Sequence, residues 1–195
     1  MIDNNAEAAS YDATRGGTAR ADSAAAAVAN LVPFPGLLLD LGGGTGLIGE
    51  RLRLRGHRVA VADLSQEMLR LAAARLPGCT MRMTAARLGL GNATFDTAIA
   101  IWLLHLTRNP EALIAEAARV LRPGGRFVTT VDKSAAQGIR RENASDALPR
   151  VITACQTQGL HRAGATSFVG EGQPGQPVYP LISFVKDWTD FDRHG

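Results

Sequence analysis

The 195-residue sequence predicts an α/β protein built on a doubly wound, mostly parallel sheet of seven strands, with an antiparallel hairpin strand at its C-terminal end. Strand-like apolar runs and helix-like amphipathic runs alternate through residues 1–131, as they do when helices cover both faces of a parallel sheet. A glycine-rich turn, residues 42–46, joins the first apolar run to a helix. Two late strands, 162–169 and 178–185, are separated only by the short loop 170–177, which favours a hairpin.

The individual elements follow from local signals. Residues 1–17 are polar and weakly patterned, so we expect a mobile segment there, whereas the alanine-rich residues 18–31 predict a helix. Ser65 is placed to cap one later helix, and Asn109, followed by Pro110, is placed to cap another. Further strands are expected at 37–41, 57–62, 79–83, 95–103 and 126–131, and further helices at 46–55, 66–76, 110–121 and 145–158.

Composition limits the function classes. The length and the 46% of hydrophobic residues predict one domain, residues 1–195, with an N-terminal lid segment (1–32), a core (33–131) and a C-terminal half (132–195). The net charge of +3 comes without a basic stripe interleaved with aromatics, so we expect no nucleic-acid partner. Cys79 and Cys155 lack metal-ligand spacing and predict reduced thiols. Without a leader or an 18-residue apolar stretch, we expect a cytoplasmic protein, and the oligomeric state stays open.

The glycine turn predicts a nucleotide-like ligand, because glycine lets a ligand lie directly on backbone N–H groups. Residues 44–49 fit the GxGxxG pattern, and Asp63 lies 19 residues beyond Gly44, so a dinucleotide is one interpretation. Asp40, however, lies two residues before the first glycine of this turn. Its carboxylate would repel a pyrophosphate and attract a cofactor that carries an ammonium group.

The order of several short motifs decides between these interpretations. The segment Asp40-x-Gly42-x-Gly44-x-Gly46 resembles motif I of the class I S-adenosylmethionine-dependent methyltransferases. Further motifs stand in the family's order, over residues 63–69, 95–96, 105–106 and 120–127, and residues 11–17 look like the N-terminal segment of its small-molecule members. The resemblance covers residues 37–131 closely and 145–185 more loosely. It implies a Rossmann-like methyltransferase fold with S-adenosylmethionine as cofactor.

The resemblance also implies roles for particular residues. The glycines would let the cofactor approach the backbone, Asp40 would orient the turn and the cofactor's amino group, and Asp63 would accept from both ribose hydroxyls. Leu64 would pack on the adenine and Ala85 would offer its N–H to the ring. Thr84 stands where the family commonly has an acid, so we expect weaker cofactor binding by about 1 kcal/mol. The cofactor-binding residues expected are Tyr11, Arg15, Asp40, Gly42, Gly43, Gly44, Gly46, Asp63, Leu64, Thr84, Ala85 and Ile101.

The acceptor side is less sharply defined. His105 is the best candidate for a general base, although a histidine that only packs in the turn is an equally simple interpretation. Asp132 and Lys133 follow the fifth expected strand, at the edge of the sheet where a ligand should bind; Asp132 could orient the acceptor or lie in a solvated turn. Trp102 could form a wall of the substrate pocket or belong to the core. We expect no metal. The function expected is methyl transfer to oxygen, nitrogen or carbon of a small molecule; an NAD-dependent oxidoreductase and a repurposed, non-catalytic cofactor-binding protein are the alternatives.

Overall fold

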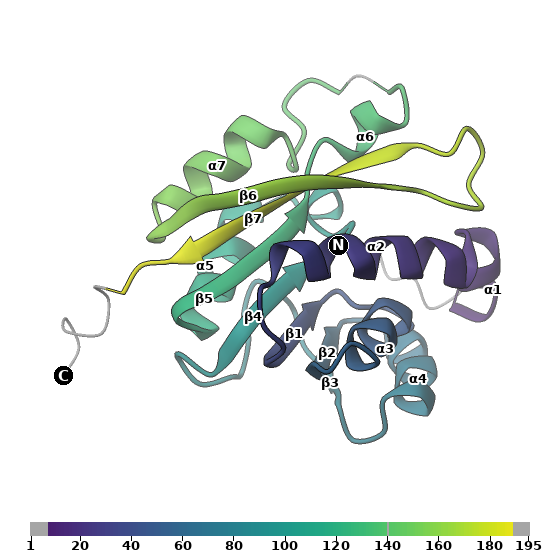
Figure 1. The fold of residues 1–195 in the computed structure, drawn as a ribbon, viewed down its shortest axis with the longest axis horizontal. Helices are drawn as coiled ribbons and strands as arrows, with labels where there is room; N and C mark the ends of the chain where they lie inside the picture. Colours follow the sequence, from purple (N-terminus) through teal and green to yellow (C-terminus); the bar gives the residue numbers. More distant parts are fainter. Residues whose placement is uncertain (1–7, 140, 189–195) are drawn as a thin grey trace.

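The computed structural model describes residues 8–139 and 141–188, and it contains one mixed sheet with the strand order β3-β2-β1-β4-β5-β7-β6. The first five strands run parallel, and β7 pairs antiparallel with both β5 and β6 (Figure 1). The fold class predicted from the sequence is therefore confirmed. In chain order the strands are β1 (Leu37–Leu41), β2 (Arg58–Asp63), β3 (Thr80–Arg82), β4 (Phe95–Ala100), β5 (Leu121–Thr130), β6 (Leu160–Val169) and β7 (Val178–Lys186).

Helices cover both faces of the sheet. One face carries α2, α3 and α4, and the other carries α5 and α7, as Figure 1 shows. In chain order the helices are α1 (Ala8–Thr14), α2 (Gly17–Leu31), α3 (Leu47–Arg53), α4 (Gln66–Arg75), the 3₁₀ helix η2 (Leu104–Leu106), α5 (Pro110–Val120), α6 (Lys133–Ala136) and α7 (Leu148–Gln156).

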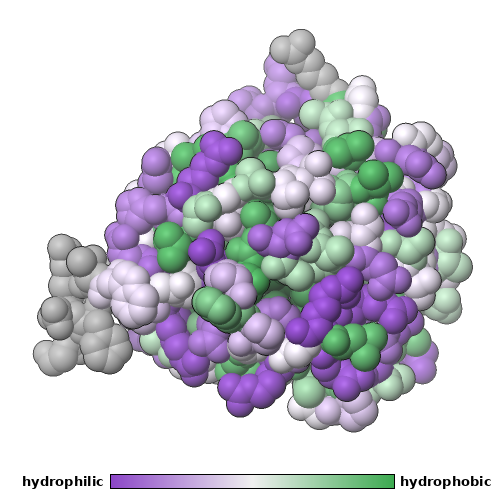
Figure 2. Space-filling view, viewed as in Figure 1, coloured by the Kyte–Doolittle hydropathy of each residue, from purple (hydrophilic) through white to green (hydrophobic). Residues whose placement is uncertain are grey.

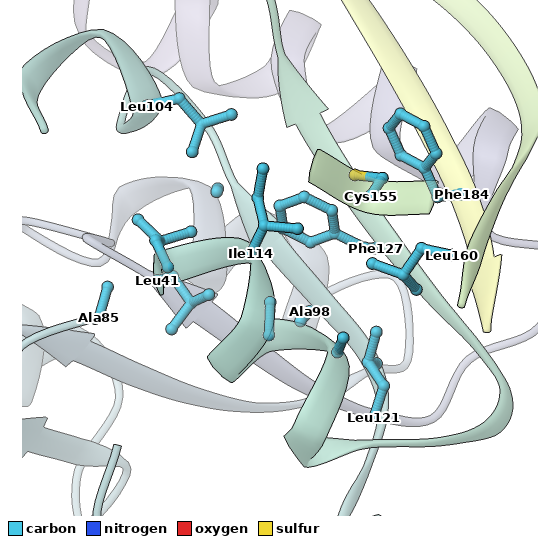
Figure 3. Packing of buried hydrophobic residues seen from close by; sticks show 14 of the residues in the cluster. Leu41, Ala85, Ala98, Leu104, Ile114, Leu121, Phe127, Cys155, Leu160 and Phe184 are labelled. Carbon is cyan, nitrogen blue, oxygen red and sulfur yellow. The ribbon is translucent and has the colours of Figure 1, made fainter. Parts of the chain in front are cut away.

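The alternation of side chains along β1 divides the core into two halves. Leu38 packs with α2 and α3, whereas Leu39 and Leu41 pack on the α5 side. On the α5 side, Ile114 and Phe127 form part of a closely packed layer between helix and sheet (Figure 3). On the opposite face, Figure 2 shows hydrophilic residues gathered over α3 and α4. The buried layers hold the sheet rigid, so the carboxyl ends of the parallel strands form a fixed edge for a site.

The expected caps are confirmed. The Met68 N–H donates to Ser65 Oγ at 3.2 Å, and the Ala112 N–H donates to Asn109 Oδ1 at 3.0 Å. Each bond satisfies one of the backbone donors that a helix leaves free in its first turn.

Three expectations need correction. Residues 8–14 form a helix instead of an unpatterned segment, because tertiary contacts of its side chains hold it; the expectation for residues 1–7 lies outside the described residues. The fourth strand ends at Ala100 instead of residue 103, since Trp102 has a φ of 55° and its N–H donates to Thr130 Oγ1. The fifth begins at Leu121, which already pairs with Phe95 before the turn at 122–125 interrupts the register.

Candidate active site

The glycine turn leaves β1 at the carboxyl edge of the sheet. Gly42, Gly44 and Gly46 have φ values of 63°, 55° and 73°, a backbone conformation that glycine adopts without strain. A Cβ added to Gly42 would lie 2.6 Å from a methyl carbon of Leu103, and one added to Gly46 would lie 2.9 Å from Ala72 Cβ. The turn therefore requires glycine both for its conformation and for its close packing.

Asp63, at the end of β2, fixes the turn from the neighbouring strand. Its Oδ2 accepts from the Gly44 N–H at 2.9 Å, and its Oδ1 accepts from the Ser65 N–H at 2.8 Å. A carboxylate offers about four lone-pair directions, so both oxygens can still accept from a ligand. Parallel pairing of β1 with β2 brings Asp63 beside the glycines, and the 19-residue separation in sequence alone does not show this contact.

Asp40 lies beneath the turn. It is 2% exposed, its Oδ2 has no hydrogen-bond partner among the described residues, and a Cβ added to Gly43 would lie 2.7 Å from that oxygen. Burial, and secondarily the charge of Asp63, raises the pKa of Asp40 to about 8. In the protein alone this side chain is therefore mostly protonated at neutral pH. The sequence led us to expect a negative charge on Asp40 that attracts the cofactor. Asp40 carries that charge at neutral pH only when a bound ligand lowers its pKa.

Two adjoining hollows, of about 60 and 50 Å³, lie over the turn. Both are lined by Tyr11, Gly42, Gly44, Ile101 and Trp102, and we call their combined space the glycine crevice. The first hollow is also lined by Asp63, Leu64 and Ala85, and the second by Asp40, Gly43 and Arg20. Apolar side chains and a few polar groups share this lining, a combination that is typical of small-molecule sites.

The N-terminal helix closes one side of the crevice. Asp12 accepts from the Thr45 hydroxyl at 2.7 Å and pairs with the Arg75 guanidinium at 2.7 Å, so α1 is tied to both the glycine turn and α4. Arg15 lies over the Tyr11 ring, 5.7 Å from its centre, and is not itself among the lining residues. Sequence reasoning quoted Asp12 within a motif but missed this clamp, because its partners lie 33 and 63 residues away.

The loop that joins β6 to β7 meets the start of α2 (Figure 1). A Cβ added to Gly16 would lie 2.1 Å from the carbonyl oxygen of Glu171, and one added to Gly172 would lie 2.8 Å from the Gly16 Cα. The hairpin loop therefore packs directly on the N-terminal segment that borders the glycine crevice.

Only some of the residues that follow β3 line the glycine crevice. Ala85 lines the crevice, and so does Met83, which sequence reasoning missed. Thr84 is not a lining residue; its hydroxyl accepts from the Ala86 N–H at 3.4 Å, and its backbone bridges to Arg87. Met68 of α4 also lines the crevice, although helical periodicity placed it only in the core.

Trp102, after β4, walls the glycine crevice. Its ring packs edge-on against Phe168 and Tyr179, with centres 5.3 and 5.4 Å apart, and the Arg20 guanidinium lies 4.2 Å from its centre. The indole Nε1 is buried and has no hydrogen-bond partner among the described residues. The two interpretations of this residue, pocket wall and core, therefore both describe part of its environment.

His105, Asp132 and Lys133 lie beyond this wall. His105 lines a separate hollow of about 340 Å³ with Arg108 and Arg141, and its Nε2 is 2.9 Å from Lys133 Nζ. Burial, then the charges of Lys133 and Arg141, lowers the pKa of His105 to about 3, which keeps the ring neutral.

Asp132 has a φ of 49° and accepts through Oδ1 from the Leu148 N–H at 3.2 Å, which ties the end of β5 to α7. The structure thus brings His105 and Lys133 together, but not into the crevice.

Comparison with known proteins supports the same family. The methyltransferase domain family matches residues 39–129. A phosphatidylethanolamine N-methyltransferase of Cereibacter sphaeroides is 38% identical over 102 residues, which is 48% of this chain and 49% of that protein. An uncharacterized methyltransferase of Mycobacterium tuberculosis (strain ATCC 25618 / H37Rv) is 40% identical over 160 residues, or 80% of this chain and 55% of that protein. The chain thus spans about half the length of these two relatives.

A crystal structure of the Burkholderia thailandensis 1,6-didemethyltoxoflavin-N1-methyltransferase, with bound 1,6-didemethyltoxoflavin and S-adenosylhomocysteine, has the same fold. Its TM-score is 0.68 at 19% identity, over 94% of this chain and 84% of that chain. Residues 39–129 thus match a methyltransferase domain, and the chain has the fold of the S-adenosylmethionine-dependent methyltransferases, which use S-adenosylmethionine as cofactor.

The residues present fit this cofactor. The glycines leave space that Cβ atoms would fill, Asp63 offers two carboxylate oxygens for a diol, and the unpartnered Oδ2 of Asp40 suits an ammonium group. No group of three His, Cys, Asp or Glu side chains placed to hold a metal occurs within residues 8–139 and 141–188. In the same part of the chain, no helix is long and apolar enough to cross a membrane.

Proposed function

We propose that this protein transfers the methyl group of S-adenosylmethionine to an oxygen, nitrogen or carbon atom of a small-molecule acceptor in the glycine crevice. The observation that supports this most directly is Asp63, whose carboxylate holds the glycine turn and lines the crevice at the same time. The expected roles of the cofactor-binding residues are part of this proposal, supported by the positions of those that line the crevice; Arg15 and Thr84 do not line it.

The cofactor supplies a methyl group already activated on a positively charged sulfur. The protein's own task is therefore to orient an acceptor and to exclude water. Tyr11 and Trp102 both line the crevice, and the Asp12 clamp holds Tyr11 in place through α1. These contacts preorganise the crevice before an acceptor binds.

His105 stays our candidate for a general base. This role requires an acceptor that extends from the crevice to the separate hollow that His105 lines. A pKa of about 3 leaves the ring neutral but makes it a weak base, so its Nε2 must first release Lys133 and its pKa must rise. We propose that Asp132 acts indirectly, by positioning Lys133 at the end of β5, because its side chain is held by the backbone of α7.

Titration calorimetry with S-adenosylhomocysteine and, separately, NAD tests the cofactor, and incubation with methyl-labelled S-adenosylmethionine and a metabolite extract tests transfer. Asp63→Asn should weaken S-adenosylhomocysteine at least about 30-fold, since hydrogen bonds to a carboxylate contribute about 1.5–3 kcal/mol each. Asp22→Asn is the control, because this exposed side chain pairs only with Arg51 on the outer surface.

Binding of NAD without S-adenosylhomocysteine would support an oxidoreductase and contradict the proposal. Binding of S-adenosylhomocysteine with no label in any extract fraction would favour a repurposed cofactor-binding protein instead.

A further inference from the structure

Arg20 introduces a positive charge into the glycine crevice. It lies in α2, lines the hollow that also contains Asp40, and places its guanidinium 4.2 Å from the centre of the Trp102 ring. Burial lowers the pKa of Arg20, and the neighbouring Tyr11 side chain partly opposes that shift. Within residues 8–139 and 141–188, no carboxylate forms an ion pair with Arg20.

The acids near Arg20 are already occupied. Asp12 is paired with Arg75 and accepts from Thr45. Asp40 is mostly protonated at neutral pH because of its burial. A partly buried guanidinium without a carboxylate partner is costly unless a ligand supplies one.

Lys133 adds a second cation on the same side of the sheet. It follows β5, and its Nζ donates to the neutral His105 instead of to a carboxylate. Burial, followed by the charges of Arg15 and Arg20, lowers its pKa, and the charge of Asp146 acts in the opposite direction. Like charges therefore dominate around Lys133, and an anion bound nearby would relieve their repulsion.

Trp102 offers a further donor beside these cations. Its Nε1 is buried and has no partner among the described residues, and the Arg20 guanidinium lies over its ring. A buried indole N–H normally has an acceptor, so a missing partner indicates a ligand with acceptor atoms.

From these contacts we infer that the acceptor is an organic anion, whose carboxylate or phosphate group binds at Arg20, while Lys133, outside the lining of the crevice, adds a second positive charge from the end of β5. The inference rests on the proposed function and deepens it, because it names the chemical class of the acceptor. The carboxylate of the cofactor's own methionine part is the other possible source of such an anion, so the experiment must separate the two.

Two calorimetric titrations make this separation. In the first, protein saturated with S-adenosylhomocysteine is titrated with three acids and their neutral amides: 4-hydroxybenzoate with 4-hydroxybenzamide, phenylacetate with phenylacetamide, and 3-phenylpropionate with 3-phenylpropionamide. In the second, protein without acid is titrated with S-adenosylhomocysteine and with 5′-methylthioadenosine, which lacks the amino-acid part. Both are repeated with Arg20→Gln, Lys133→Gln and the control Arg70→Gln, an exposed residue paired with Glu67.

We expect at least one acid to bind tenfold more tightly than its amide, and Arg20→Gln to abolish that preference. Lys133→Gln should reduce the preference at least threefold, and Arg70→Gln should leave it unchanged. Affinity for S-adenosylhomocysteine should stay within threefold in all three variants.

The inference is overturned if no acid exceeds its amide, or if Arg20→Gln weakens S-adenosylhomocysteine tenfold while leaving 5′-methylthioadenosine unchanged, because the anion would then be the cofactor's. Failure of S-adenosylhomocysteine to bind the unaltered protein would instead overturn the proposed function, and this inference with it.

Discussion

Replacing Asp40 by asparagine tests the electrostatics beneath the glycine turn. The pKa of Asp40 is raised to about 8 by burial and by Asp63, and its Oδ2 has no hydrogen-bond partner among the described residues. An ammonium group beside this oxygen favours the charged form and lowers the pKa. Binding of S-adenosylhomocysteine should therefore expel the proton that Asp40 holds in the protein alone.

The size of this effect follows from the pKa. A group with a pKa of about 8 is about 0.9 protonated at pH 7, so binding should release about 0.9 proton per site. Calorimetry at pH 7 in phosphate and in Tris, which differ in ionisation enthalpy, measures this number directly. Affinity should also rise about ninefold from pH 6 to 7 and about fivefold from pH 7 to 8, and then level off.

Asp40→Asn should abolish both the proton release and the pH slope, whereas the control Asp22→Asn should retain them. Equal heats in the two buffers for the unaltered protein, or an unchanged slope in Asp40→Asn, would refute the reasoning.

The same pKa predicts the pH dependence of stability. Because the pKa of Asp40 in the folded protein, about 8, lies above the ordinary pKa of 3.8, the folded protein holds the proton more tightly than the unfolded chain does. The stability that this gives is complete below about pH 4 and is lost as the pH rises toward about 8. Urea unfolding should show that decline in the unaltered protein and a flatter profile in Asp40→Asn.

Three further changes test other contacts. Gly16→Ala should lower the free energy of unfolding by at least about 2 kcal/mol more than Gly78→Ala in urea titrations, because both have positive φ but only Gly16 meets a backbone oxygen of the hairpin loop, at 2.1 Å; equal losses would contradict that contact. Burial raises the pKa of Cys155 to about 12, so this thiol should react with a thiol reagent at pH 8 only after unfolding, whereas the partly exposed Cys79 should react in the folded protein. Rapid labelling of both thiols in the folded protein would be inconsistent with the packing of Cys155. Thr84→Asp should tighten S-adenosylhomocysteine by about 1 kcal/mol in calorimetry, and unchanged or weaker binding would show that this position does not reach the cofactor.

Much of the scaffold could be predicted because its signals are local. The apolar run before the glycines, the caps at Ser65 and Asn109 and the short hairpin loop each depend on a few neighbouring residues. The errors occurred where distant contacts decide: α1 forms because Asp12 bonds to α4 and to the glycine turn, and β4 stops where Trp102 turns toward Thr130. Neither contact leaves a periodic pattern in the sequence.

The candidate site divides in the same way. The glycine turn and Asp63 could be identified from motif order, and both line the crevice. The role of Arg20 could not be identified from the sequence. Arg20 reaches the crevice from α2, and the alanine-rich sequence of this helix predicts only packing. The Lys133 and His105 pair likewise depends on the adjacency of β4 and β5.

The amino-acid sequence by itself determined the order of helices and strands, the wide glycine turn and the acid that follows the second strand, because short-range sterics and periodic burial specify them. Only the tertiary structure decided the ionisation of Asp40, the clamp on α1 and the placement of the Arg20 charge in the glycine crevice. Burial and the proximity of charges depend on which segments the fold brings together, and no local pattern encodes that distance.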